Sequence, residues 1–133
     1  MSHPIVDLQT ALVTALRADA ALAGLVGEAI HDAPPPGMVA PYVVIARHDV
    51  VPRDGDLAPG HEHRVALHIW ADRPSRRAAL EIAERVLAVA EGFAAESIAI
   101  THRRHERTDT AIDLDRGQAR AVLSLRFFTE PAA

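Results

Sequence analysis

The sequence has no cysteine, no lysine, few aromatic residues and no long apolar run. The absence of cysteine excludes disulfides and thiolate metal sites. A membrane-spanning helix needs about 18 or more apolar residues in a row, and the N-terminus has no basic region followed by an apolar stretch. We therefore expect no membrane segment and no signal peptide. The few serines do not occur in a nucleophile-elbow context, so we expect neither enzymatic activity nor a cofactor.

The charge balance argues against a general nucleic-acid binder. The 14 basic residues, all arginines, are outnumbered by 18 acidic residues, which gives a net charge of −4. Residues before Ala66 contribute 4 basic and 8 acidic side chains, and the rest contribute 10 of each. A nucleic-acid binder normally shows a basic excess. The exclusive use of arginine is most simply a coding bias, with bidentate interface contacts as the functional alternative.

The length and composition predict a single domain, residues 1–133, with a modest core. A chain of this size buries roughly two-thirds of its unfolded surface on folding. Hydrophobic residues make up 49% of the sequence, but 26 of them are alanines and only 4% of residues are aromatic. Alanine removes little apolar area from water, and burial contributes only about 25 cal/mol per Å². We expect the isolated subunit to have ordinary stability at best.

Apolar periodicity predicts two main helices and one short helix. Residues 5–16 place leucines on one helical stripe. A short helix over Asp19–Val26 has an aspartate as its expected cap. The second main helix runs from about Ser75 to Glu91, with Asp72 or Ser75 as its cap and Pro74 in its first turn.

Alternating apolar residues predict strands that are separated by proline- and glycine-rich connectors. This order of elements predicts a fold of the α+β class. We expect a sheet of about four antiparallel strands with two main helices packed on one side. The expected strands are a brief one within 28–32 and longer ones at 42–48, 65–70, from 98 towards 107, and at 119–129. The expected connectors are 34–37, a long polar hairpin loop at 51–60, and 109–117.

Histidines suggest a metal site that the spacing does not support. Zinc needs three or four ligands at about 2.0–2.1 Å. His61 and His63 point to one face of a strand, but Glu62 alternates to the other face, and no spacing matches a known metal motif. The other histidines considered as metal ligands are His68, His102 and His105. We favour the interpretation that the histidines lie on the surface and bind no metal.

The densest basic segment contains Arg103, Arg104 and Arg107. Such a strand can contact phosphates, but four acidic residues between positions 106 and 115 neutralise it. No aromatic residue is interleaved to stack on bases. We therefore favour a solvated or intersubunit polar face.

Three more arginines, Arg73, Arg76 and Arg77, crowd the start of the second main helix. The helix dipole disfavours cations there by about 0.3–1 kcal/mol each. Arg77 can pair with Glu81 at four-residue spacing, which offsets about 0.2–0.5 kcal/mol. This helix end is a candidate contact for an acidic surface of a partner.

The order of several short apolar and turn segments is the most distinctive pattern in the chain. In order, these segments are Leu8–Leu12, Leu16–Leu22, Ile30–Asp32 with Pro34–Pro36, Ala40–Ile45, His63–Trp70 with Asp72, Arg76 and the helix Ala79–Val86, and Ala121–Phe127. In this order they resemble the tail-completion, or tail-terminator, proteins of long-tailed phages and gene transfer agents. The resemblance covers nearly the whole chain.

The resemblance implies a structural protein of a virion or phage-like particle, made in the bacterial cytoplasm. Such α+β domains form hexameric rings at the head-proximal end of the tail tube, stop its growth and support joining to the head connector. The implied partners are further copies of the chain, the tail tube protein and the head–tail connector proteins. DNA passes through the ring without sequence-specific contact, and no membrane is involved.

The family supplies no catalytic or metal residues, so contacts must be inferred from the chain itself. The polar hairpin loop and the arginine-rich segments are the natural choices. The candidate subunit or tail-tube contacts are Arg53, Asp54, Asp56, Leu57, Arg73, Arg76, Arg103, Arg104 and Arg107. The alternatives are a head–tail adaptor or stopper of the same kind of particle, a small histidine-based metal-binding or enzymatic domain, and a generic interaction module.

Overall fold

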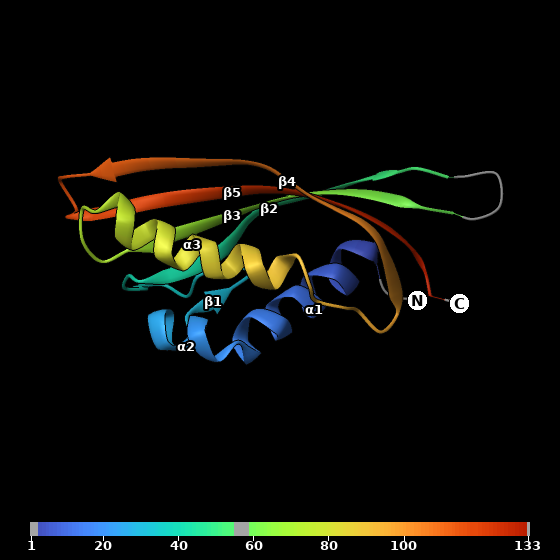
Figure 1. Cartoon of the computed structure of the whole chain (residues 1–133), viewed down its shortest axis with the longest axis horizontal. Helices are drawn as coiled ribbons and strands as arrows, with labels where there is room; N and C mark the ends of the chain where they lie inside the picture. Colours follow the sequence, from blue (N-terminus) through green and yellow to red (C-terminus); the bar gives the residue numbers. More distant parts are fainter. Residues whose placement is uncertain (1–2, 55–58, 133) are drawn as a thin grey trace.

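A computed structural model describes residues 3–54 and 59–132. Within these ranges three helices lie on one face of a five-stranded sheet, as Figure 1 shows. The α+β class is thus confirmed, with five strands rather than about four. The helices are α1 (Pro4–Ala18), α2 (Ala20–Val26) and α3 (Arg76–Ala90), and the strands are β1 (Ile30–His31), β2 (Tyr42–Pro52), β3 (His61–Ala71), β4 (Ile98–Asp113) and β5 (Gln118–Pro131).

The sheet has the strand order β1-β2-β3-β5-β4, and all neighbours are antiparallel except β1 and β2. The brief strand expected within 28–32 is therefore a real edge strand, which accounts for the extra member of the sheet. No helix among the described residues is long and apolar enough to cross a membrane.

The helix boundaries follow from side-chain caps. Asp19 separates α1 from α2, and its carboxylate accepts a hydrogen bond from the Leu22 N–H at 2.9 Å, as expected for an N-cap. Of the two candidate caps for α3, Ser75 is the one used, since its Oγ accepts from the Ala78 N–H at 3.2 Å. Pro74 consequently precedes the cap, and its expected place in the first turn is wrong.

Two expected connectors are shorter than predicted. β4 continues through Asp109–Asp113, which we expected to be a polar connector, because these residues pair with Val122–Gln118 of β5. The turn is confined to 114–117 and ends at Gly117, whose φ of 65° suits glycine. Likewise β2 extends to Pro52, so the hairpin connection spans 53–60 rather than 51–60.

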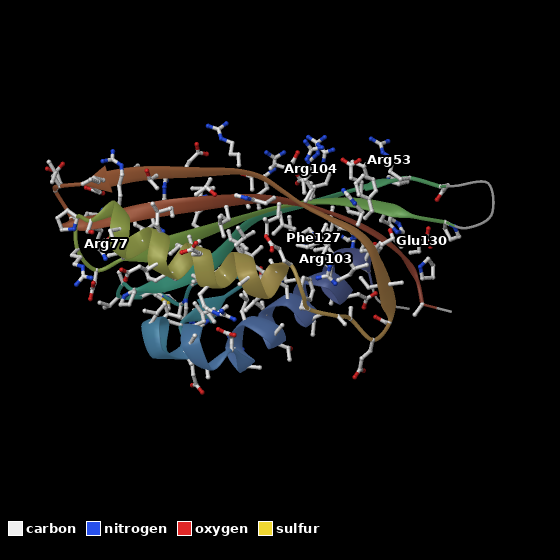
Figure 2. All side chains as sticks on the ribbon, viewed as in Figure 1. Arg53, Arg77, Arg103, Arg104, Phe127 and Glu130 are labelled. Carbon is white, nitrogen blue, oxygen red and sulfur yellow. The ribbon has the colours of Figure 1, made fainter. Side chains whose placement is uncertain are left out.

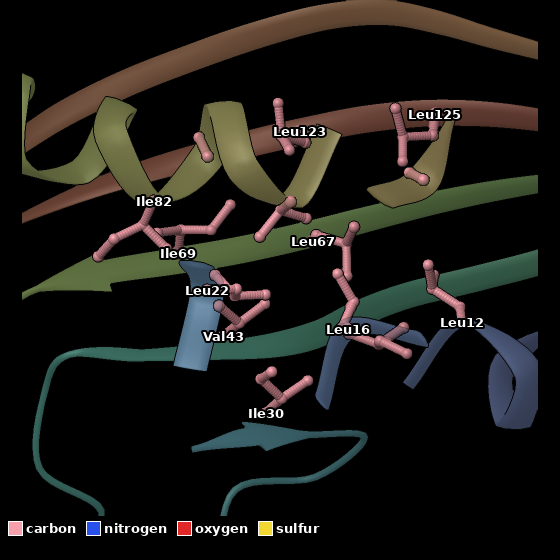
Figure 3. Packing of buried hydrophobic residues seen from close by; sticks show 14 of the residues in the cluster. Leu12, Leu16, Leu22, Ile30, Val43, Leu67, Ile69, Ile82, Leu123 and Leu125 are labelled. Atoms are coloured by element: carbon pink, nitrogen blue, oxygen red, sulfur yellow. The ribbon is translucent and has the colours of Figure 1, made fainter. Parts of the chain in front are cut away.

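The core lies between the helix layer and the inner face of the sheet (Figure 3). The leucine stripe of α1 is fully buried, and Ile82 and Val86 of α3 pack into the same cluster. Asp19 also binds Arg85 of α3 through both carboxylate oxygens, at 2.8 and 2.9 Å, which joins the α1–α2 corner to α3. Among the described residues, the helices therefore cover one face of the sheet and leave the other free.

Candidate assembly surface

The face of the sheet turned away from the helices, called the outer face below, is the largest candidate contact surface. Figure 2 shows Arg53 and Arg104 pointing away from the helices on this side, whereas Arg103 and Phe127 point towards them. Strand alternation and register define its members. They include Arg47 and Asp49 of β2, Glu62, Arg64, His68 and Trp70 of β3, Arg104, Arg107 and Asp109 of β4, and Arg120, Arg126 and Phe128 of β5.

A single buried carboxylate organises one end of the outer face. Glu62 is only 4% exposed. Burial alone raises the pKa of this carboxyl, but hydrogen bonds from Arg64 and Arg53 and the charge of Arg126 outweigh the burial, so the pKa lies below its usual value. Its oxygens lie 3.2 Å from Arg53 Nε, 3.3 Å from Arg64 Nε and 3.8 Å from Arg126 Nε. The carboxylate thus holds side chains from the hairpin, β3 and β5 together.

Apolar side chains mark the opposite end of the outer face. The rings of Tyr42 and Trp70 lie 6.4 Å apart, and the Arg120 guanidinium lies over the Trp70 ring at 5.6 Å. A shallow groove beside Trp70 is bordered by Ile112 and Leu114. Leu114 is 78% exposed. Exposed apolar side chains of this kind are suited to contact with another protein.

A histidine pair lies on the inner face, where the sequence had suggested surface positions. His63 is fully buried, because it shares the inner face of β3 with Val65 and Leu67. Its Nδ1 is 2.8 Å from His48 Nε2, and its Nε2 is 2.9 Å from Thr129 Oγ1. Burial lowers the pKa of each histidine to about 4. The surface assignment of His63 is therefore wrong.

The same geometry bears on the metal alternative. His61 and His63 share one face of β3, with ring centroids 6.4 Å apart, and Glu62 points to the other face, as the alternation predicted. In the part of the chain that the structure describes, no three histidine or acidic side chains converge as a metal site. The buried imidazoles bind each other and a threonine instead.

The predicted contacts in the hairpin are held by local bonds. The Arg53 N–H donates to the Gly60 carbonyl at 2.8 Å, and the Gly60 N–H donates to Asp54 Oδ1 at 3.3 Å. Arg53 and Asp54 are both exposed. The other two predicted hairpin contacts, Asp56 and Leu57, lie outside the described residues.

Gly60 closes this hairpin, and the substitution Gly60→Ala is expected to weaken it. A Cβ at this position would lie 2.6 Å from the Arg53 carbonyl oxygen, so the backbone would have to shift. The site is near the end of the hairpin, which extends past the helix layer (Figure 1), so the shift is accommodated at about 1 kcal/mol. Urea unfolding measures the loss, and Gly24→Ala, with nothing within 4 Å of the new Cβ, is the control.

The remaining predicted contacts occupy different places. Arg73 is exposed in the β3–α3 connection, and Arg76 donates from Nε to Thr110 Oγ1 at 3.1 Å, linking α3 to β4. Arg104 and Arg107 lie on the outer face. Arg103 points inwards and donates to the carbonyls of Ala90 and Phe93 at the end of α3.

This distribution separates the predicted residues into groups. Arg103 has bonding partners inside the subunit, and burial lowers the pKa of its guanidinium. The hairpin, the start of α3 and the outer face remain predicted contacts. Sequence reasoning missed the buried carboxylate at one end of the outer face, Glu62 with Arg64 and Arg126. The only signal was an acidic residue flanked by inward-facing histidines.

Comparison with known proteins identifies the family. Residues 10–130 match the family described as tail completion protein gp17. A chain in the structure titled "Virion of native gene transfer agent (GTA) particle" is similar at 27% identity and a TM-score of 0.83, over 97% of this chain and 99% of that one. The gp17 protein of bacteriophage SPP1 shares the fold, at 21% identity and a TM-score of 0.61 over 90% and 86% of the two chains. No curated protein matches the sequence significantly. Because the family match spans nearly the whole chain, the protein belongs to the tail completion protein gp17 family, whose members are structural proteins of phage-like particles.

Proposed function

We propose that the protein forms a ring, hexameric when assembled, at the head-proximal end of a phage-like tail tube. There it stops tube growth and supports joining of the tail to the head connector. The observation that carries the proposal is the similarity to a chain of a gene transfer agent virion, which covers 97% of this chain and 99% of that one. The proposed partners are copies of the chain, the tail tube protein and the connector.

The surface of the subunit is large enough for this role. A ring built from one kind of subunit uses heterologous contacts, so each copy presents two different patches. A standard interface buries about 800 Å² on each partner. The subunit exposes 7586 Å², so two such patches would take about a fifth of its surface. The outer face, the free sheet edges and the hairpin together offer that area. The proposed role requires no catalysis, and DNA crosses the ring without sequence-specific contact.

Particles assembled without this protein test the proposal. We expect tails of irregular or excessive length that are not attached to heads, since nothing ends the tube or joins it to the connector. Negative-stain electron microscopy measures tail length and attachment, and the intact gene supplied in trans is the control. Unattached tails of normal length would instead favour the head–tail adaptor role. Binding of this protein to purified tail tube protein would then argue against that role, and a lack of binding would support it. Normal, attached tails contradict both roles.

A further inference from the structure

The sheet ends in two different open edges. β4 pairs only with β5, so its other side has no strand beside it among residues 3–54 and 59–132. At the opposite edge, β1 pairs with Val43 and Val44, and in the part of the chain that the structure describes no strand lies beside β2 from Arg47 to Pro52. Open edges carry unpaired N–H and C=O groups and can template pairing with another chain.

Bulges restrict which part of each edge can pair. β4 has register shifts between Ile100 and His102 and between His105 and Arg107, and β2 has one between Ile45 and Arg47. A bulge disrupts the ladder locally and increases the twist. The regular segments are therefore residues 107–113 of β4 and 47–52 of β2, and these have similar lengths.

Each regular segment begins with the same outer-face pattern, an arginine followed two residues later by an aspartate. Arg47 Nε lies 2.5 Å from Asp49 Oδ2, and Arg107 Nη2 lies 2.6 Å from Asp109 Oδ1. All four side chains are substantially exposed, between 44% and 70%. Each edge thus presents one positive and one negative group on the same face of the sheet.

We propose that β2 of one subunit pairs antiparallel with β4 of a second copy, so that Arg47 faces Asp109 of the partner subunit and Asp49 faces Arg107 of the partner subunit. This inference rests on the proposed ring and names the contact that joins its members. Opposite charges directly across an antiparallel pair contribute about 0.2–1 kcal/mol each. Because the two joined edges differ, the contact is heterologous and repeats from subunit to subunit.

The charge pattern selects this register over its neighbours. A slip of two residues one way sets Arg47 against the partner's Arg107, and a slip the other way sets Asp49 against the partner's Asp109. Parallel pairing also sets like charges side by side. A slip of one residue turns the side chains of one strand to the other face. Antiparallel pairing in the proposed register is therefore the arrangement that matches both charges.

The helix side of the same edge supplies further contact area. A groove between α3 and β4 is lined by Leu80, Leu87, Thr108 and Leu123. Leu80 is 38% exposed. A second copy paired along β4 extends the sheet beside this groove and brings its own side chains over it. This contact adds to the strand pairing, which alone buries less than a standard interface of about 800 Å² per partner.

Charge reversal on each edge tests the pairing. Arg47→Asp sets two aspartates against each other across the proposed contact, and Asp109→Arg sets two arginines against each other. We expect each single variant to lower the yield of completed, head-attached tails at least about tenfold, the effect of a change of about 1.4 kcal/mol. The double variant Arg47→Asp/Asp109→Arg restores opposite charges between copies, and we expect it to recover most of that yield.

The double variant separates contacts between subunits from those within one. Inside each subunit it places like charges at 47 and 49 and again at 107 and 109, so a purely intrasubunit role predicts that it is the worst of the three. Glu96→Arg, at an exposed position in the connection between α3 and β4, is the charge-change control and should keep the normal yield. Single variants with normal yield, or a double variant without rescue, overturn the pairing.

A cross-link reports on the pairing independently of tail yield. Because the chain has no cysteine, the pair Arg47→Cys/Asp109→Cys introduces the only thiols. Oxidation of assembled particles is expected to give covalent multimers of this chain, and Arg47→Cys/Asp113→Cys, displaced by four residues, should give few. If the protein forms a ring on particles but these thiols do not cross-link, the pairing fails and the proposed function stands. If no ring forms on particles at all, the proposed function fails first.

Discussion

The substitution Phe127→Ala is expected to lower the free energy of unfolding by about 3–5 kcal/mol. The Phe127 side chain is 1% exposed and meets Phe93 edge to face, with ring centroids 5.7 Å apart. Arg103 in turn lies over the Phe93 ring at 5.0 Å. Removing the ring leaves a cavity beneath the end of α3, where an alanine-rich helix has few large side chains to refill it. Typical domains are stable by only about 5–15 kcal/mol, so the loss is severe.

The neighbouring phenylalanine supplies the control. Phe128 lies on the outer face and is partly exposed, with its ring 5.6 Å from that of His102. Phe128→Ala removes the same number of atoms from a less buried site, so we expect less than about half of the loss. Urea denaturation of both variants at pH 7 measures the difference. Equal losses would contradict the assignment of the two faces of β5.

The residues of β5 show why the strand faces were predictable from sequence. Ala121, Leu123, Leu125 and Phe127 occupy alternate positions of the strand expected at 119–129, and all are buried in the structure. A strand turns alternate side chains to opposite sides, so a buried face leaves a period-2 pattern in the sequence. The caps at Asp19 and Ser75 are equally local, because each is decided by a side chain and an N–H three residues on.

The edge strands were less predictable because their pairing is not local. Asp109–Asp113 contains acidic residues that are uncommon in strands, and only the contact with β5 makes it one. Pro52 can end β2 because the side of the strand away from β3 is open there and its missing N–H leaves no bond unmade. A pattern of apolar residues in the sequence indicates which side chains are buried. These positions are instead held in their strands by backbone pairing with a neighbouring strand.

The organisation of the candidate surface was the least predictable part. The arginines were recognised as a group, but Arg103 and Arg104 face opposite sides, which depends on their register against Phe127 and Arg126. Glu62 is buried by arginines from other segments of the chain. Contacts between side chains that are far apart in sequence leave no periodic signal, so only the folded sheet brings them together.

Lowering the pH from 7 to 5 is expected to destabilise the subunit through His48 and His63. Burial lowers the pKa of each to about 4, against about 6.5 in the unfolded chain. Between these values the unfolded chain binds more protons, so stability is complete above pH 6.5 and is lost as the pH falls towards 4. Allowing for water around the partly exposed His48, the pair accounts for about 2 kcal/mol. His3 and His61 lie near His63 and act in the same direction, whereas Asp49 and Asp32 partly oppose it at His48.

The double variant His48→Gln/His63→Gln tests this assignment. Glutamine keeps hydrogen-bonding groups but does not titrate, so the difference in unfolding free energy between pH 7 and pH 5 should shrink by about 2 kcal/mol. Thr129→Val is the matched control. It removes the Thr129 hydroxyl that lies 2.9 Å from His63 Nε2, so we expect lower stability at both pH values. Both histidines remain, so most of the difference between the two pH values should remain as well. Glu62 and Asp19 have pKa values below those of ordinary carboxyls and lose their charge only under more acidic conditions. An unchanged pH difference in the double variant would show that other groups cause it.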